Sequence, residues 1–335
     1  MTSEYPTLLY FDEQHGAKAS SSTSGSADLL LSLGIPLLSL TPSVISTLLP
    51  SSPFCFLFAQ LFHPSLAPLG PIRRALGHPT IFNVLGPLVN PAKPKRCILG
   101  VHSAYLGQIF AEALKKRGCQ RAWVVCGREG LDEISIEGET DVWQLDDGVV
   151  THLTLSPSDF GLRSHPLRNV ASYSSAENAA IVMHMLGADA SSSQDDELEA
   201  QLISSLPPLP LDVDVEAIRD YTLLQTSALL FVGGYATDYV EATRLARVSM
   251  TSPGGARQAL RTFRTLSVAA VNKADEEAAK AKKAEVEALA QDTEVKRLRD
   301  ARERKDAKDS LMDVRKDEYF YAPEPVRSVG VGTDD

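Results

Sequence analysis

The segment from Leu29 to Ile72 contains no Asp, Glu, Lys or Arg, and this most constrains how the chain can fold. Its first part, residues 29–49 (LLLSLGIPLLSLTPSVISTLL), is long enough to span a lipid bilayer. Gly34 and two prolines interrupt it, however, and several serines and threonines dilute it. Because proline and glycine break long helices, we expect short elements in the buried core of an α/β protein and no membrane insertion.

Composition narrows the class of protein further. The 335 residues are 44% hydrophobic and 23% charged, enough for one large domain or two smaller ones. A net charge of −10 argues against nucleic acid and against an anionic membrane as partners. The four cysteines have no metal or redox spacing, which indicates reduced thiols in a cytoplasmic protein. The acidic N-terminus is unlike a signal or transit peptide.

Periodicity predicts a mostly parallel central sheet flanked by helices. Residues 96–102 and 121–127 are apolar strand candidates, and residues 106–117 between them have helical spacing. Such a run is a βαβ unit, which places its strands in parallel. An Asp147-Gly148 turn predicts a hairpin within residues 141–155. Two short strands are expected at 7–11 and 35–40, helices at 176–186, 213–232 and 239–250, and a surface connection at 190–212.

The sequence changes character near residue 271. From there to residue 318, acidic and basic residues alternate at helical spacings with frequent alanine, which predicts a charged helical or partly disordered extension. Apolar residues are too sparse for a coiled-coil heptad. We therefore expect one α/β domain over residues 1–270, the extension over 271–318, and a disordered tail over 319–335.

The loop QHGAKASSSTSGSAD, residues 14–28, has the composition of a linker but lies between an apolar strand and an apolar helix. Free N–H groups and hydroxyls at a helix N-terminus attract anions, phosphate above all. Lys18 adds a positive charge and His15 a ring donor. The position of the loop therefore favours a phosphate site over a flexible linker.

Two more stretches carry candidate site residues. Arg73 and Arg74 lie in a nearly uncharged region, where an arginine needs an anionic partner, although a surface pair is the simpler interpretation. Asp132 and Glu133 follow the strand at 121–127, at the sheet edge where ligands bind in α/β proteins. Adjacent carboxylates near a phosphate loop suit Mg²⁺, and an ordinary acidic loop is the alternative.

These stretches, in this order, resemble anthranilate phosphoribosyltransferase, most closely the fungal enzymes. The resemblance runs from about Leu8 to Ser267. It is carried by HGAKASSSTSGSADLLLSLG, HPSLAPLGPIRRALGHPTIFNVLGPLVNPA and GLDEIS, with SYSSAENAAIV and RLARVSMTSPGGARQALRTF farther on. It implies the nucleoside phosphorylase and phosphoribosyltransferase type of α/β fold, with part of a small helical subdomain. The charged extension has no counterpart in that family.

The resemblance also implies a reaction, in which the amine of anthranilate displaces diphosphate from C1 of 5-phosphoribosyl-1-diphosphate, a step of tryptophan biosynthesis. It implies Mg²⁺ and no organic cofactor, and no residue acting as acid, base or nucleophile, since the protein positions substrates and stabilises charge. The implied donor-binding residues are His15, Gly16, Lys18, Ser21 and Ser22. The implied anthranilate-binding residues are His15, His63, Arg73, Gly86 and Pro87, with Arg73 at the carboxylate. The implied metal ligands are Asp132 and Glu133.

Two features depart from the family pattern. Gln14 replaces a lysine, which removes a charge that would hold diphosphate. The initial helical segment and the Gly-Thr-Gly turn that cradles diphosphate have no counterpart before Tyr10, so we expect a partial donor site. An N-terminally truncated sequence, a degenerate relative and a missing part supplied by another chain all fit this departure. These helices form much of the family's dimer surface, and their absence counts against the homodimer that the resemblance implies.

Two other functions stay open on the sequence. One is an inactive homologue that acts as a binding or interaction protein and presents its helical extension to a partner. Arg73, Asp132 and Glu133 argue against this reading. The other is a different phosphoribosyl or nucleoside transferase of the same fold, and the stretch at residues 63–91 argues against it.

Overall fold

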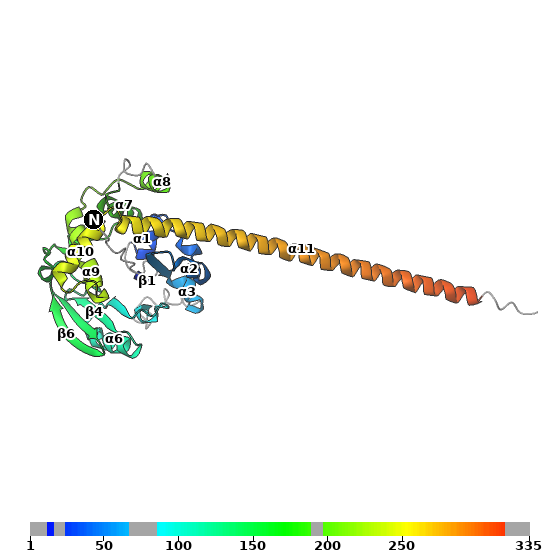
Figure 1. Cartoon of the computed structure of the whole chain (residues 1–335), viewed down its shortest axis with the longest axis horizontal. Coiled ribbons are helices and arrows are strands. Elements are labelled where there is room, and N and C mark those ends of the chain that lie inside the picture. Colours follow the sequence, from blue (N-terminus) through cyan, green and yellow to red (C-terminus); the bar gives the residue numbers. More distant parts are fainter. Residues whose placement is uncertain (1–11, 17–23, 67–85, 189–196, 319–335) are drawn as a thin grey trace, which may run out of the picture. The chain divides into compact units, whose positions relative to one another are not determined.

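The computed structural model describes residues 12–16, 24–66, 86–188 and 197–318 (Figure 1). The chain divides into two compact units, Met1–Asn272 and Lys273–Asp335. Within the described residues, no helix combines the length and the apolar character needed to cross a membrane. The expected strand at residues 7–11 lies outside this part of the chain, and the first described strand is β1 (Asp12–Gly16).

The βαβ unit predicted from the sequence is confirmed. Strand β3 (Arg96–Gly100) leads into helix α6 (Ala104–Lys116) and then into β4 (Arg121–Gly127). The two strands are parallel neighbours with Arg96 opposite Arg121. Their carboxyl ends therefore meet at one edge of the sheet, where loops can build a site.

The hairpin is confirmed as well. Strands β5 (Thr140–Asp146) and β6 (Val149–Leu155) pair antiparallel. Asp147 and Gly148 both have positive φ, +43° and +82°, as the tight turns that suit right-handed strand twist require. The strand order is β3-β4-β5-β6. The α/β class is thus confirmed, but this sheet is mixed rather than mostly parallel, because the hairpin adds antiparallel pairings.

The charge-free segment forms short elements, as expected. Helix α1 (Ser26–Ser32), the 3₁₀ turn η1 (Leu37–Ser39) and helix α2 (Pro42–Leu48) connect β1 to its parallel partner β2 (Phe54–Phe58). The strand expected at residues 35–40 is wrong. Pro36 cannot donate to a strand ladder, and the 3₁₀ turn buries Leu37 and Leu40, three residues apart, while Leu38 faces solvent.

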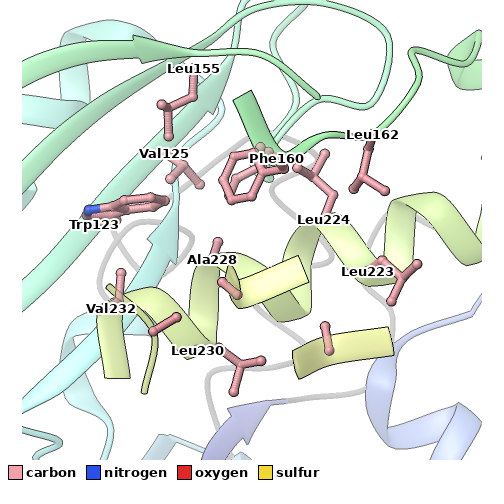
Figure 2. Packing of buried hydrophobic residues seen from close by; sticks show 14 of the residues in the cluster. Trp123, Val125, Leu155, Phe160, Leu162, Leu223, Leu224, Ala228, Leu230 and Val232 are labelled. Carbon is pink, nitrogen blue, oxygen red and sulfur yellow. The ribbon is translucent and has the colours of Figure 1, made fainter. Parts of the chain in front are cut away.

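Side-chain alternation along β4 builds two cores, one on each face of the four-stranded sheet. Trp123 and Val125 face helices α9 (Val215–Gly233) and α10 (Tyr239–Thr251), with Phe160 and Leu224 beside them (Figure 2). Val124 and the other residues of opposite parity face α6 instead. The buried indole N–H of Trp123 has a hydrogen-bond partner in this core, because it donates to Gln144 Oε1 at 3.0 Å. The sheet is therefore covered by helices on both faces.

The expected helices in the second half of the chain are present as α7 (Ser175–Met185), α9 and α10. Short 3₁₀ turns complete this part at η4 (Pro157–Phe160) and η5 (Leu167–Val170). Helix α3 (Ala59–Phe62) and the 3₁₀ turn η2 (Pro64–Leu66) follow β2, and the 3₁₀ turn η3 (Gly86–Val89) precedes β3. Part of the expected surface connection is helical instead, as α8 (Glu197–Ser205).

A buried carboxylate explains why α8 forms. Glu199 is 1% exposed. It accepts two hydrogen bonds from Arg257, at 3.2 and 2.9 Å, and one from Arg261 at 2.5 Å. Burial alone raises the pKa of Glu199, but the two arginines outweigh it and hold the pKa below its ordinary value of 4.5. A fully paired ionised carboxylate thus fixes α8 to the first turns of α11 (Ala256–Glu318).

The second unit consists, in its described part, of the remainder of α11. Residues 275–310 are exposed, and the ion pairs are local, such as Lys283–Glu287 at 3.9 Å and Arg299–Glu303 at 3.5 Å. Within residues 275–310, the large exposed apolar residues do not share a face, because their spacing distributes them around a helix of about 100° per residue. They are Val286, Leu289, Val295 and Leu298.

Glu199→Gln should lower the free energy of unfolding by about 3 kcal/mol at pH 7, because it leaves two arginines without their buried anion. The folded-state pKa of Glu199 is depressed, so its stabilisation is fully present above pH 4.5 and is lost as the pH falls through that lower pKa. Urea denaturation from pH 7 down to pH 3 should show the unfolding free energies of the wild-type chain and of Glu199→Gln converging. Glu197→Gln, exposed on the same helix, should change stability by less than about 0.5 kcal/mol.

Candidate functional site

The loop between β4 and β5 lies against the end of β3. A Cβ added at Gly100 would stand 1.6 Å from the backbone oxygen of Asp132. Only glycine permits that approach. The loop is thereby placed at the shared carboxyl end of the parallel strands β3 and β4, and it carries Asp132 and Glu133.

Packing and hydrogen bonds hold the loop in one conformation. Ile134 and Ile136 are fully buried in the core between the sheet and α9. Between them, the buried Ser135 donates its N–H to Thr140 Oγ1 at 2.8 Å. The Ser135 hydroxyl oxygen accepts the N–H groups of the two residues that follow Ile136, both at 3.1 Å, and the hydroxyl also bonds to the Glu129 carboxylate. The two carboxylates therefore precede a rigid segment.

Helix α9 fixes the same loop from its other side. Gln225 Nε2 donates to the Ile134 carbonyl at 2.7 Å, and Gln225 Oε1 accepts the Ile134 N–H at 3.4 Å. One turn earlier, the Tyr221 hydroxyl donates to Glu133. The sequence reasoning missed both residues. The available signal was that Tyr221 and Gln225 lie four residues apart and so share one face of the predicted helix.

The electrostatics around the pair favour a cation. Burial raises the pKa of Glu133, the Tyr221 hydrogen bond lowers it, and the Asp132 charge raises it again, with a net rise. The pKa of Tyr221 is also raised, by burial first and then by the surrounding carboxylates. Asp132 is exposed and makes no hydrogen bond or ion pair with any described residue. A divalent cation would relieve this accumulation of negative charge.

The donor set fits Mg²⁺ shared with a substrate. Asp132 and Glu133 offer oxygen ligands only, which this hard cation prefers. The described ranges hold no group of three or more His, Cys, Asp or Glu side chains arranged as a metal cluster. Protein-bound Mg²⁺ commonly takes one or two carboxylates and completes its shell with water and phosphate oxygens.

Other predicted residues lie at the ends of β1 and β2. His15 and Gly16 are the last residues of β1, with Gly16 opposite Phe58 in the parallel register. His63 directly follows α3, the short helix that begins where β2 ends. These three residues therefore lie at or beyond the same end of a parallel pair.

Gly86 and Pro87 open η3. No described atom lies within 4 Å of where a Cβ at Gly86 would stand. Lys18, Ser21, Ser22 and Arg73 fall outside the described residues, and their roles stay predictions.

The structure qualifies the anion site expected at the N-terminus of α1. The helix has only seven residues, and the Asp28 carboxylate in its first turn accepts the Gly25 N–H at 3.2 Å. That negative charge already compensates the partial positive charge of the helix end. The described part of this helix end therefore gives no support of its own to a phosphate site, and the roles of residues 17–23 stay predictions.

The chain is similar to known phosphoribosyltransferases. Residues 13–257 match the model of the glycosyl transferase family, a/b domain. Anthranilate phosphoribosyltransferase of Schizosaccharomyces pombe is 42% identical over 254 residues, covering 76% of this chain and 65% of that protein. The Rhizobium meliloti enzyme is 38% identical over 257 residues, covering 77% and 68%.

A solved structure agrees with these relatives. Anthranilate phosphoribosyltransferase from Saccharomyces cerevisiae, in complex with PRPP and Mg, superposes with a TM-score of 0.63 at 32% identity. The match covers 76% of this chain and 64% of that one. The chain thus spans about two thirds of the length of the relatives it matches.

Gly100→Ala should displace the Asp132 loop and lower the free energy of unfolding by about 2 kcal/mol, because the new Cβ would overlap a backbone oxygen. Hydrogen exchange at residues 131–135 should accelerate. Gly138→Ala is a matched control in the same loop, since no described atom lies within 4 Å of its Cβ position. Equal effects of the two substitutions would contradict the role given to Gly100.

Proposed function

Because the chain belongs to the anthranilate phosphoribosyltransferase family, we propose that it transfers the 5-phosphoribosyl group from phosphoribosyl diphosphate to anthranilate. The product is N-(5-phosphoribosyl)anthranilate, and the reaction belongs to tryptophan biosynthesis. The observation that carries the proposal is the Asp132–Glu133 loop, held at the carboxyl end of two parallel strands by Gly100 and Gln225.

The reaction needs positioning more than acid or base chemistry. The anthranilate nitrogen forms a bond to C1 of the ribose, the C1–oxygen bond to diphosphate breaks, and the nitrogen gives up a proton. Bound Mg²⁺ would neutralise the charge that develops on the departing diphosphate. The chain's own task is to hold the two reactants in line and to keep water from C1.

Each group of residues has a proposed part in that task. Asp132 and Glu133 would hold the metal, with Tyr221 and Gln225 keeping their loop in place. The loop residues Lys18, Ser21 and Ser22, with His15 and Gly16 at the end of β1, would bind the phosphoribosyl donor. Arg73 would pair with the anthranilate carboxylate in a pocket that also involves His15, His63, Gly86 and Pro87.

The direct test uses the purified full chain with phosphoribosyl diphosphate, anthranilate and Mg²⁺, and follows the loss of anthranilate fluorescence. Calorimetric titration with anthranilate alone, and with the donor, runs in parallel. Turnover supports the transferase. Saturable binding without turnover would instead favour an inactive homologue that acts as a binding protein, and the absence of both would overturn the proposal.

Asp132→Asn should weaken Mg²⁺ binding at least about tenfold and lower the transferase rate, because a metal ligand loses its charge. The measurement is the Mg²⁺ concentration at half-maximal rate, with calorimetric Mg²⁺ titration in the presence of donor. Asp147→Asn removes the same charge from an exposed turn that accepts asparagine at positive φ. An unchanged metal titration for Asp132→Asn would remove this assignment.

Arg73→Ala should raise KM for anthranilate about 10- to 100-fold, since a charged hydrogen bond to a carboxylate contributes about 1.5–3 kcal/mol. The KM for the phosphoribosyl donor should change little, because the donor does not use this arginine. Steady-state kinetics with each substrate varied in turn separates the two effects. Arg74→Ala is the control, and equal losses for both substrates with Arg73→Ala would contradict the carboxylate role.

A further inference from the structure

Two cysteines far from the carboxylate loop lie in contact with each other. Cys97 Sγ and Cys119 Sγ are 3.7 Å apart, although 22 residues separate them in the chain. Cys97 lies near the amino end of β3, and Cys119 lies in the turn between α6 and β4. The pair therefore sits toward the end of these strands opposite Gly100 and Gly127, and the proposed transferase reaction does not use it.

The surroundings make the two thiols unequal. The hydrogen bond from the Cys97 thiol, backbone N–H groups of the turn and the Lys95 charge lower the pKa of Cys119 to about 7, against an opposing effect of burial. The pKa of Cys97 is raised, by its hydrogen bond to Cys119 and by burial. Of the two, Cys119 therefore ionises more readily and Cys97 keeps its proton, the difference that separates an attacking sulfur from a resolving one.

The other two cysteines lack these features. Cys55 and Cys126 are buried free thiols, and burial raises the pKa of Cys126, as do the carboxylates around it. The turn beside Cys119 is accessible, since Gly118 and Gln120 are exposed. Cys119 itself is 8% exposed, against 4% for Cys126 and 1% for Cys55, and its partner Cys97 is half-buried. Of the four thiols, the Cys97–Cys119 pair is thus the one that a small oxidant can reach most readily.

We propose that Cys97 and Cys119 form an oxidisable dithiol, which a peroxide converts into an intramolecular disulfide. The Cys119 thiolate attacks a peroxide oxygen, the O–O bond breaks, and a sulfenic acid forms while hydroxide leaves. Cys97 sulfur then attacks Cys119 sulfur, the S–S bond forms, and the sulfenic oxygen departs as water with the Cys97 proton. Overall two thiols lose two electrons and two protons, and one hydrogen peroxide becomes two waters.

The geometry asks for a small adjustment only. The sulfurs must close from 3.7 Å to the disulfide length of about 2.05 Å, which side-chain rotation in the flanking turn can supply. The bond would close a loop that contains all of α6 and join the start of β3 to the start of β4. A cross-link of this kind stabilises mainly by restricting the unfolded chain.

The experiment treats the reduced full chain with hydrogen peroxide, blocks the remaining thiols by alkylation, and digests the chain with trypsin without reductant. The expected product is the peptide 97–115 linked to the peptide 118–121, with a loss of 2 Da from the intact chain and a higher Tm that dithiothreitol reverses. Cys97→Ser and Cys119→Ser should each abolish the linked peptide, and Cys126→Ala should leave it unchanged.

Alkylation kinetics give a second readout that does not depend on the disulfide. The alkylation rate of Cys119 should rise with a midpoint near pH 7 in the wild-type chain and at a higher pH in Cys97→Ala, which removes the hydrogen-bond donor. Sulfinic acid on Cys119 without any linkage would overturn the proposal, as would a linkage through Cys55 or Cys126, or no reaction at all. The transferase assay is independent, so failure of either hypothesis leaves the other standing.

Discussion

The backbone oxygen of Asp132 lies where a side chain on residue 100 would have to be, and the candidate site depends on that close approach. It places the loop after β4 against the end of β3. Ile134 and Ile136 then enter the core, and Gln225 binds both backbone groups of Ile134. The two adjacent carboxylates are thus held by backbone geometry and core packing. The core packing of Ile134 and Ile136 stabilises the loop enough to offset the repulsion between the two carboxylates.

Local patterns predicted a large share of the fold. The βαβ unit over residues 96–127 followed from two apolar strands around one amphipathic helix, and the hairpin followed from the Asp147-Gly148 turn. Helices α9 and α10 also follow strong periodicity. Asp132 and Glu133 could be proposed as a site because they follow a buried strand and because the family motif includes them. In each case the deciding information lies within a few residues of the element.

The features that were predicted wrongly or missed have a different origin. Each is determined by a distant contact or by the backbone chemistry of proline, which local patterns do not show. Pro36 converts an apolar run into a 3₁₀ turn. Glu199 makes α8 a packed helix through Arg257, 58 residues away. Tyr221 and Gln225 reach the site loop across 88 and 91 residues. A single sequence carries no direct signal for such pairings.

The buried carboxylate on α8 also determines where the chain tolerates changes in length. Arg257 and Arg261 reach Glu199 together because they are four residues apart on one helix face. A single residue inserted between them would turn the second guanidinium by about 100° and separate it from its anion. Beyond residue 272, pairs such as Lys283–Glu287 each lie within about one turn, so insertions between pairs leave every pair intact. Evolution can therefore lengthen or shorten the later part of α11 freely, whereas its first two turns do not accept insertions.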